Sequence, residues 1–306
     1  MIDFDKGVQK LSGYGGSEAK TAVLYGGAMY MVKYPDPVRE KNNQLSYMNN
    51  QYSEYIGCHI ANACGIKAQE TVLGYMTSVG GIRKIVVGCK DFTEDEGVLY
   101  EFSRIAKQTK EGKREELTIE YVKEVVEAHP LITDKDEVMC GFWDMYVIDA
   151  LIGNKDRHLD NWGLVENGGK LRFAPIYDCG SSLAALMSDD KMRNVMQDMT
   201  EFRNCEYNVY SCYKYGGKKM FYHEIFRNPS CELGAAIKRV VPRVDMNAIG
   251  ELIGKTEEIA ETRKEYLKRA VNMRYEEILL SALKRQNRQG NGDDGGQGSR
   301  GLLKRR

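Results

Sequence analysis

The sequence predicts an α+β fold of two lobes, a small β-rich N-terminal lobe and a larger, mainly helical C-terminal lobe. Glycine-containing turns separate two pairs of strand-like segments, at residues 21–25 and 28–34 and at residues 72–75 and 82–89. Apolar side chains then recur at helical spacing, over about 99–110, 117–129, 136–152, 232–241, 245–254 and 256–285. The change of pattern predicts an N-terminal lobe over residues 1–88 and a helical lobe over residues 89–286.

Composition and charge narrow the class of protein. The chain has 306 residues, of which 42% are hydrophobic, enough for a sizeable core. Its 44 basic and 44 acidic residues cancel, so no global field attracts nucleic acid or an anionic membrane. No apolar run has the length of a membrane span, and the N-terminus lacks the apolar stretch of a signal peptide. The eight cysteines contain no Cys-x-x-Cys pair, so we expect reduced thiols in a cytoplasmic protein.

Several segments have no clear periodicity. Residues 35–46 are polar and predict irregular structure, and residues 181–204 are polar and methionine-rich, which makes them a candidate substrate-facing segment. Residues 205–222 are dense in tyrosine, which we interpret as packing around an irregular loop and not as a base-stacking platform. Residues 287–306 are rich in Gly, Asn, Asp and Gln and almost without apolar side chains, so we expect a disordered tail.

The most informative stretch is a polar loop that follows a buried helix. The apolar segment 141–152 leads into a loop that carries Asp156 and Asn161, and a hairpin around Gly168-Gly169 then returns the chain to Asp178. Phosphoryl transfer needs such a set, because one carboxylate must orient and deprotonate an attacking hydroxyl. An amide and a second carboxylate must hold Mg²⁺ against the nucleotide phosphates.

Each of these residues alone has a simpler interpretation. Asp and Asn are common in loops because their side chains cap backbone amides and tolerate left-handed conformations. The combination is more specific, since the buried helix, the Asp…Asn loop, the hairpin and the Asp-x-Gly follow at short spacing. The pattern therefore predicts Asp156 as the catalytic carboxylate and Asn161 and Asp178 as Mg²⁺ ligands.

The N-terminal part offers candidates for binding the nucleotide phosphates. A glycine-rich turn that includes Gly15, Gly16 and Ser17 precedes the first strand, and glycines let backbone N–H groups approach phosphate oxygens. Glycine clusters are also ordinary hairpin turns, so the pattern is weak by itself. Lys33 ends the second strand. A lysine there is either solvated or, in a kinase-like lobe, bound to the α- and β-phosphates.

Two further interpretations concern the rest of the cleft. Asn49 or Asn50 can cap a helix that ends at Gly65. Glu54 lies off the apolar stripe of this helix, so it is either an exposed charge or the partner of Lys33. The strand 82–89 then runs into a polar linker, which is typical of a hinge between lobes. Backbone groups from Val87 to Cys89 are therefore candidates for pairing with an adenine edge.

The quoted motif resembles a known family. Asn154-x-Asp156-x-His158-x-x-Asn161 followed by Tyr177-Asp178 is similar to the signature of the HipA-like serine/threonine kinases. Phosphatidylinositol kinases share a similar catalytic loop. The resemblance implies a two-lobed protein-kinase-like fold that uses ATP and Mg²⁺, with a serine or threonine of a protein as the acceptor.

The resemblance also assigns roles in the N-terminal lobe. Residues 16–21 look like the family's phosphate loop, which implies that Ser17 and Lys20 help to hold ATP, although the family usually has Gln where Ser17 stands. Ser53-Glu54-Tyr55 looks like the family's helix motif, which implies that Glu54 orients Lys33. HipA-like kinases can phosphorylate a serine beside the loop, which makes Ser12 and Ser17 candidates for autophosphorylation.

The chain departs from long HipA-like proteins at its N-terminus. Those proteins carry an additional domain before the phosphate loop, whereas this loop begins near residue 12, as in the short form described as cell-translocating kinases. The contacts that long forms make to an antitoxin through that domain do not carry over, so a toxin-like role with an antitoxin-type partner stays open but has no support in this sequence. Two other functions also stay open, a kinase for lipids or small molecules and a nucleotide-binding pseudokinase that acts through binding a partner.

Overall fold

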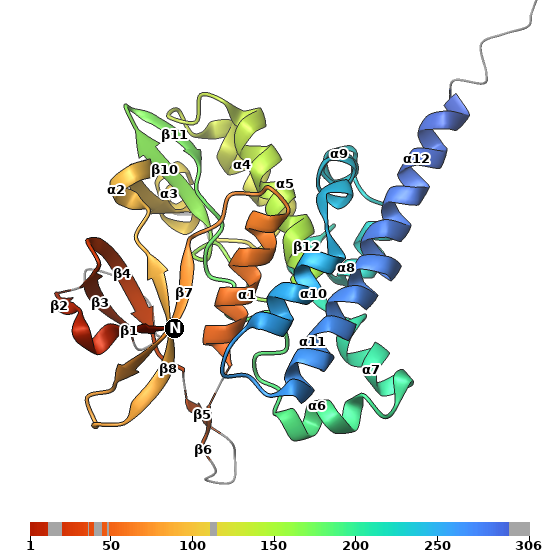
Figure 1. The fold of residues 1–306 in the computed structure, drawn as a ribbon. Coiled ribbons are helices and arrows are strands. Elements are labelled where there is room, and N and C mark those ends of the chain that lie inside the picture. The colour runs from red at the N-terminus through yellow and green to blue at the C-terminus, as the bar shows by residue number, and fades with distance from the viewer. Residues whose placement is uncertain (12–19, 36, 40–44, 48, 111–114, 294–306) are drawn as a thin grey trace, which may run out of the picture.

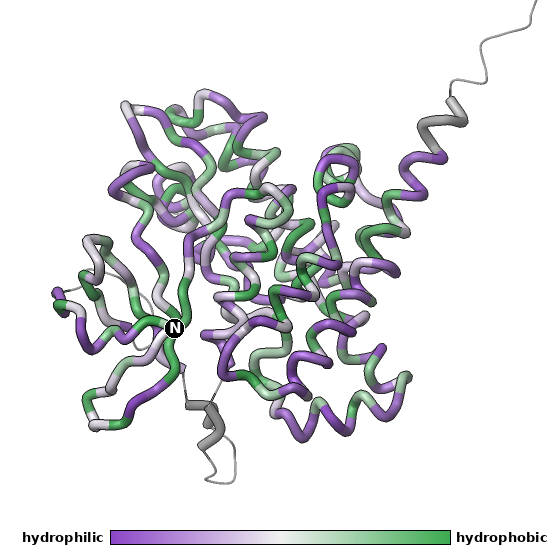
Figure 2. The backbone as a smooth tube through the Cα atoms, viewed as in Figure 1, coloured by the Kyte–Doolittle hydropathy of each residue, from purple (hydrophilic) through white to green (hydrophobic). Residues whose placement is uncertain are grey.

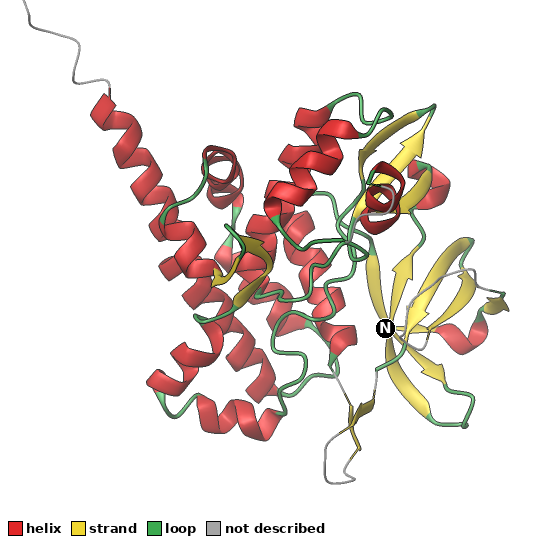
Figure 3. Cartoon of the chain, turned by 180° about the vertical axis from the view of Figure 1, so that it is seen from behind, coloured by secondary structure: helices red, strands yellow, loops and turns green. Residues whose placement is uncertain are grey.

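The computed structural model describes residues 1–11, 20–35, 37–39, 45–47, 49–110 and 115–293, and it shows the two expected lobes. Most strands gather in one lobe and most helices in the other, with the two-stranded β12–β13 hairpin lying against the helices (Figure 3). Within these residues no helix is both long and apolar enough to cross a membrane.

A six-stranded sheet forms most of the N-terminal lobe, in the order β1-β7-β8-β4-β3-β2 (Figure 1). Its strands are β1 (Ile2–Asp3), β2 (Val8–Lys10), β3 (Lys20–Tyr25), β4 (Ala28–Lys33), β7 (Thr71–Thr77) and β8 (Arg83–Lys90). β1 pairs with β7 in parallel, and the other neighbours are antiparallel. Both predicted hairpins are present, and Gly26 and Gly27 have the positive φ angles, 58° and 85°, of a two-residue hairpin turn.

Phe4 fills the core of this lobe from a short 3₁₀ turn, Phe4–Lys6. Its side chain is fully buried and belongs to one cluster with Val23, Val32 and Val86. A Cβ atom at Gly88 would lie 2.3 Å from the Phe4 ring, so the absence of a side chain there makes room for the aromatic ring.

Helix α1 (Asn50–Ala63) lies beside β7, between the sheet and the helices of the C-terminal lobe (Figure 1). Asn49 is its N-cap residue, but the Asn49 side chain does not cap the helix and instead bonds to the carbonyl of Ala185 at 3.4 Å. The Tyr52 hydroxyl donates to the carbonyl of Glu258 at 2.6 Å. α1 is therefore fixed to the C-terminal lobe by contacts distant in sequence.

A three-stranded sheet, in the order β11-β10-β9, lies beside the helices of the C-terminal lobe (Figure 1). β10 (Gly163–Asn167) and β11 (Lys170–Phe173) form the predicted hairpin, whose turn residues Gly168 and Gly169 have positive φ angles. The third strand, β9 (Val98–Glu101), corrects the prediction of a helix from Leu99. Its branched and aromatic side chains favour a strand, and Gly97 lets the chain pass against β10, since a Cβ there would lie 2.2 Å from the Glu166 carbonyl oxygen.

Helix α5 (Lys135–Ile152) is the centre of the C-terminal lobe, and every residue from Met145 to Ile152 is buried. Around it lie α3 (Phe102–Thr109), α4 (Ile119–Ala128), α8 (Tyr222–Arg227), α9 (Cys231–Val240), α10 (Met246–Lys255) and α11 (Glu261–Arg274). In Figure 2 the outer helices α6 (Asp189–Val195) and α7 (Met199–Glu206) are mostly hydrophilic. α5 ends at Gly153, whose left-handed conformation turns the chain toward the site loop.

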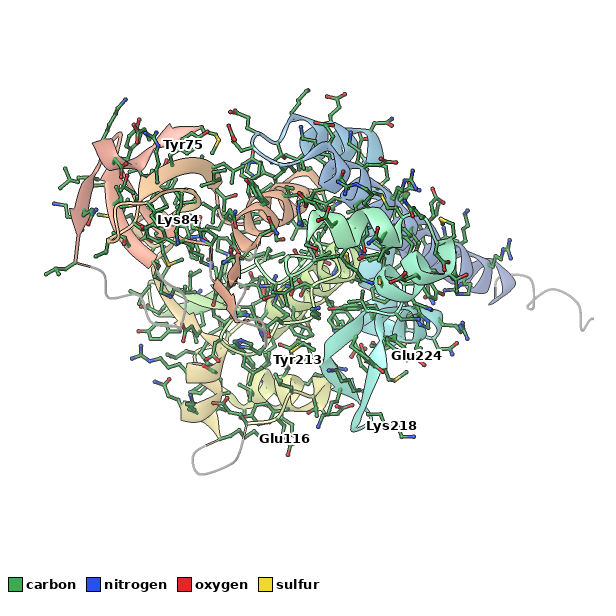
Figure 4. All side chains as sticks on the ribbon, turned by 90° about the horizontal axis from the view of Figure 1, so that it is seen from below. Tyr75, Lys84, Glu116, Tyr213, Lys218 and Glu224 are labelled. Carbon is green, nitrogen blue, oxygen red and sulfur yellow. The ribbon has the colours of Figure 1, made fainter. Side chains whose placement is uncertain are left out.

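Two stretches that were expected to be irregular form β-hairpins instead. Residues 37–39 and 45–47 form short paired strands, β5 (Pro37–Arg39) and β6 (Leu45–Tyr47), in a stretch expected to be irregular. The tyrosine-rich stretch is a β-hairpin, β12 (Tyr210–Tyr215) and β13 (Lys218–Phe221), with Lys218 at its outer turn in Figure 4. Its tyrosines do pack, since Tyr213 is fully buried.

The C-terminal helix also has other bounds than expected. α11 begins at Glu261 and not near residue 256, because Thr256 ends α10 by bonding back to Leu252. A π-helical stretch, Tyr275–Leu280, then leads into α12 (Ser281–Asp293). The helix thus enters the segment expected to be disordered from residue 287, although Gly, Asn and Asp there are poor helix formers, because it continues a helix that is anchored upstream by the buried Leu279 and Ala282. Residues 294–306 lie outside the described chain.

Candidate active site

The two lobes enclose a cleft of about 510 Å³. The sheet contributes Lys20 and Lys33 to its wall, and the C-terminal lobe contributes Asp156, Asn161 and Asp178. Five predicted candidates, drawn from both lobes, thus line one cavity, whereas Glu54 lies behind Lys33 and is not part of the lining. The other lining residues are Met31, Gln69, Asp91, Phe92, Thr93, Leu99, Glu101, His158, Asp160, Tyr177 and Ser181.

Lys33 joins the two lobes. Its ammonium nitrogen lies 2.9 Å from Oδ1 of Asp178 and 3.7 Å from Oε2 of Glu54. The other carboxylate oxygen of Glu54 accepts a hydrogen bond from the backbone N–H of Asp178 at 3.0 Å. Glu54 is only 1% exposed, so its buried charge is compensated by these two contacts. The arrangement is the lysine–glutamate pair that kinases place beside the phosphates.

Asp178 has an uncommon backbone conformation, with a φ angle of 59°. Aspartate is one of the few residues that adopt this region readily, and the conformation turns the carboxylate toward Lys33. Burial alone would raise the pKa of Asp178, but the charge and hydrogen bond of Lys33, aided by Arg157 and His158, hold this pKa below its ordinary value. The group is therefore an anion at neutral pH, as a Mg²⁺ ligand must be.

The site loop places Asp156 by backbone contacts. The backbone N–H of Asp156 donates to Oδ1 of Asn154 at 3.1 Å, and the carbonyl of Asp156 accepts from the Asn161 amide at 2.6 Å. The carboxylate itself accepts a hydrogen bond from Ser181 Oγ at 3.2 Å. Because the loop is held by other atoms, the Asp156 carboxylate can receive a proton from an acceptor hydroxyl.

Arg157 is the functional residue that the sequence interpretation missed. Its guanidinium group is 1% exposed and pairs with the fully buried carboxylate of Asp149 at 2.9 Å. The same group donates to the carbonyl of Asn161 at 2.6 Å and to the carbonyl of Tyr177. One buried cation therefore connects α5, the site loop at Asn161 and the segment just before Asp178. The signal was an Asp within an otherwise apolar helix, eight residues before an Arg.

We expect Arg157→Leu to lower the free energy of unfolding by about 3–5 kcal/mol, because it leaves the Asp149 carboxylate buried without its partner. Denaturant unfolding of the purified variant measures this loss. The matched control is Arg239→Leu. Arg239 pairs with Asp144 but is 31% exposed, and its loss is expected to cost about 1 kcal/mol or less. Equal losses in the two variants would contradict a special role for Arg157.

Comparison with known proteins gives the family. Residues 12–240 match the family described as HipA-like C-terminal domain. The chain belongs to the HipA-like kinase family. This HipA-like kinase is 35% identical over 279 residues to the serine/threonine-protein kinase CtkA of Helicobacter pylori, across 87% of this chain and 82% of that protein.

Solved structures agree with this assignment. The crystal structure of the Helicobacter pylori proinflammatory kinase CtkA matches the HipA-like kinase with a TM-score of 0.83 at 32% identity, covering 94% of this chain and 98% of that chain. The HipA of Shewanella oneidensis MR-1, solved with HipB and operator DNA, matches with a TM-score of 0.52 at 14% identity, covering 90% of this chain and 67% of that chain. The second match shows a shared fold, and together they confirm the predicted two-lobed α+β architecture.

Not every predicted residue of the HipA-like kinase lies in the cleft. Val87 and Cys89 are fully buried in β8, between β4 and β7, where both residues pair on either side. They do not line the cavity, because the strand continues to Lys90. Phe92 and Thr93 line it instead, beyond the end of the strand. Gly15, Gly16 and Ser17 lie outside the described residues.

The residues in the cleft fit ATP and Mg²⁺. Asp178 and Asn161 offer carboxylate and amide oxygens, which are the donors that Mg²⁺ prefers. Among the described residues no group of three Asp, Glu, His or Cys side chains forms a metal site. Mg²⁺ normally keeps waters and shares substrate phosphates, so two protein ligands suit it when a nucleotide is present. Lys20 of β3 and Lys33 of β4 are paired on neighbouring strands and both line the cleft, where they supply positive charge for the phosphates.

Proposed function

We propose that this HipA-like kinase transfers the γ-phosphoryl group of ATP to a serine or threonine hydroxyl of a protein. The observation that carries the proposal is the convergence of Lys33 and Asp178 from the two lobes, beside Asp156 and Asn161, in one cleft, with Glu54 buried behind Lys33. The relative named as a serine/threonine-protein kinase supports this choice of acceptor.

Each residue has a defined part in the reaction. The oxygen of the acceptor hydroxyl attacks the γ-phosphorus, and Asp156 accepts the proton that this hydroxyl loses. The bond between the γ-phosphorus and the β–γ bridging oxygen breaks, and ADP leaves. Lys33, fixed by Glu54, binds the phosphates in the attack geometry. Asn161 and Asp178 would hold Mg²⁺, which neutralises phosphate charge when bound. Met31, Phe92 and Leu99 give the cleft an apolar end that suits an adenine ring.

The test is incubation of the purified protein with γ-labelled ATP, Mg²⁺ and a mixed protein substrate. We expect label on protein, recovered as phosphoserine or phosphothreonine after hydrolysis, and loss of labelling when EDTA is added. Vesicles that contain phosphatidylinositol form a second arm of the assay. Label on lipid alone would favour the lipid kinase. Stabilisation by ATP and Mg²⁺ without transfer to any acceptor would favour the pseudokinase.

Autophosphorylation is expected at Ser12 or Ser17, beside the glycine-rich turn and outside the described residues. A phosphate adds about −1.5 to −2 charges at pH 7, which would repel the ATP phosphates from this loop. Peptide mapping after incubation with ATP and Mg²⁺ should find phosphate within residues 11–21, together with weaker ATP binding. Phosphate elsewhere, or unchanged ATP affinity, would contradict this expectation. An antitoxin-type partner and a cytoplasmic location stay predictions.

A further inference from the structure

A second cavity, of about 590 Å³, meets the cleft at the catalytic residue. Its lining includes Gly153, which follows α5, Lys191 of α6, and Cys205 and Glu206 of α7. Asp156 and Ser181 line both cavities, so a chain bound in the second one could present a group to Asp156. Ser181 Oγ donates to the Asp156 carboxylate at 3.2 Å, which is the contact that an acceptor hydroxyl must make.

A strained segment, held in place by the surrounding structure, leads into the lining of this cavity at Ala184. Leu183 and Ala184 both have left-handed backbones, with φ angles of 50° and 52°. Such conformations of non-glycine residues cost about 1–3 kcal/mol each and persist where neighbours over-determine them, often at ligand sites. Here the N–H of Leu183 donates to the Ile152 carbonyl at 3.0 Å, and Arg263 donates to the Met187 carbonyl at 2.6 Å.

Part of the lining of this cavity is apolar. Leu186 follows the strained residues, and 58% of its surface is exposed, although it is a large hydrophobic residue. Met187 and Val209 continue this apolar surface along the cavity. An apolar side chain of a bound polypeptide would remove the Leu186 side chain from water, which is favourable.

Charged side chains also line this cavity. Lys155 precedes the catalytic Asp156, is exposed and makes no ion pair within the described part of the chain, whereas the cavity's other lysine, Lys191, is paired with Glu201 at 2.5 Å. The acidic Glu206 of the same lining is already bound by Tyr266 and Arg274. Lys155 therefore supplies a positive charge that no ion pair among the described residues holds, beside the Asp156 carboxylate that lines the same cavity.

We propose that this cavity binds the acceptor segment and selects a serine or threonine that has an apolar residue and an acidic residue nearby in the chain. The inference rests on the proposed function and adds the substrate class. Leu186 and Met187 contact the apolar residue, Lys155 pairs with the acidic residue, and the acceptor hydroxyl replaces Ser181 Oγ at Asp156. The bond made and the bond broken are those of the proposed transfer to a hydroxyl.

The test is a positional-scanning library of Ser- and Thr-centred peptides, with γ-labelled ATP and Mg²⁺. The wild type should prefer Asp or Glu at one position and an apolar residue at another. Lys155→Glu should reverse the first preference to Lys or Arg and raise KM for the best acidic peptide by about tenfold, since like charges then face each other. Leu186→Asp should remove the apolar preference and keep the acidic one.

Lys170→Glu is the matched control, because Lys170 is an exposed lysine beside the β10–β11 turn and lines neither cavity. It should retain both wild-type preferences. An unchanged acidic preference in Lys155→Glu would overturn the proposal, as would a wild type that labels intact proteins but shows no positional preference. Label on phosphatidylinositol vesicles with none on peptides would also overturn it. Loss of all transfer, to any acceptor, would instead be a failure of the proposed function.

Discussion

Replacing Asp156 with asparagine is expected to lower the rate of phosphoryl transfer by about 10²–10⁴-fold, the usual contribution of a general base. Asparagine has nearly the same size but cannot accept the hydroxyl proton. The loop should keep its shape, because the contacts to Asn154 and Asn161 use the backbone of Asp156 and not its carboxylate. Single-turnover assays with labelled ATP measure the rate, and calorimetry with ATP and Mg²⁺ checks that the nucleotide still binds.

The matched control for this variant is Asp136→Asn. Asp136 is an exposed carboxylate in the first turn of α5, at the end of the helix opposite to the site loop. It should retain wild-type transfer and stability. Equal incorporation by wild type and Asp156→Asn, into the protein itself and into general substrates, would remove Asp156 from the reaction.

Asp178→Asn is expected to reduce transfer by a similar factor or more, about 10³-fold, because it removes the charged ligand that holds the metal against the phosphates. The fold should be largely kept. The Asp178 side chain is 32% exposed, and asparagine also tolerates the left-handed backbone at this position. Transfer measured over a range of Mg²⁺ concentrations should show a higher Mg²⁺ requirement in the variant.

The Asp178→Ala variant distinguishes the effect of losing the Asp178 charge from the effect of the left-handed backbone at this position. The Asp178→Ala variant should lose phosphoryl transfer to the same extent as Asp178→Asn. Its free energy of unfolding should be lower by a further 1–2 kcal/mol, roughly, because alanine adopts the left-handed conformation less readily than Asp or Asn. Thermal unfolding of both variants measures the difference. Normal activity per folded molecule in either variant would make Asp178 a structural residue.

Local patterns predicted much of this molecule. The two lobes, the Gly26-Gly27 and Gly168-Gly169 hairpins and the buried α5 follow from periodicity and turn residues, which act over a few positions. Lys33, Asp156, Asn161 and Asp178 were also found from short motifs, and the structure brings them to one cleft. Their roles are proposals that the variants above test.

The errors came from contacts between distant segments. The length of β8 depends on its two partner strands, so the sequence alone placed the hinge at Val87 and Cys89, inside the sheet. β9 is a strand because β10, more than 60 residues later, pairs with it. The Arg157–Asp149 pair was missed because a charged residue in an apolar helix has no visible partner until the loop folds back.

The anchoring of α1 has a consequence for inhibitor chemistry. Its Glu54 contacts Lys33 on one lobe and the Asp178 backbone on the other, and its Tyr52 hydroxyl bonds to the carbonyl of Glu258. A compound that requires α1 to swing outward must break all three contacts before it binds. The free energy spent on breaking them lowers the affinity of that compound. Compounds that fill the 510 Å³ cleft with α1 in place meet no such penalty. Screening for this protein should therefore begin with flat, ATP-sized heteroaromatics and not with molecules built for a displaced helix.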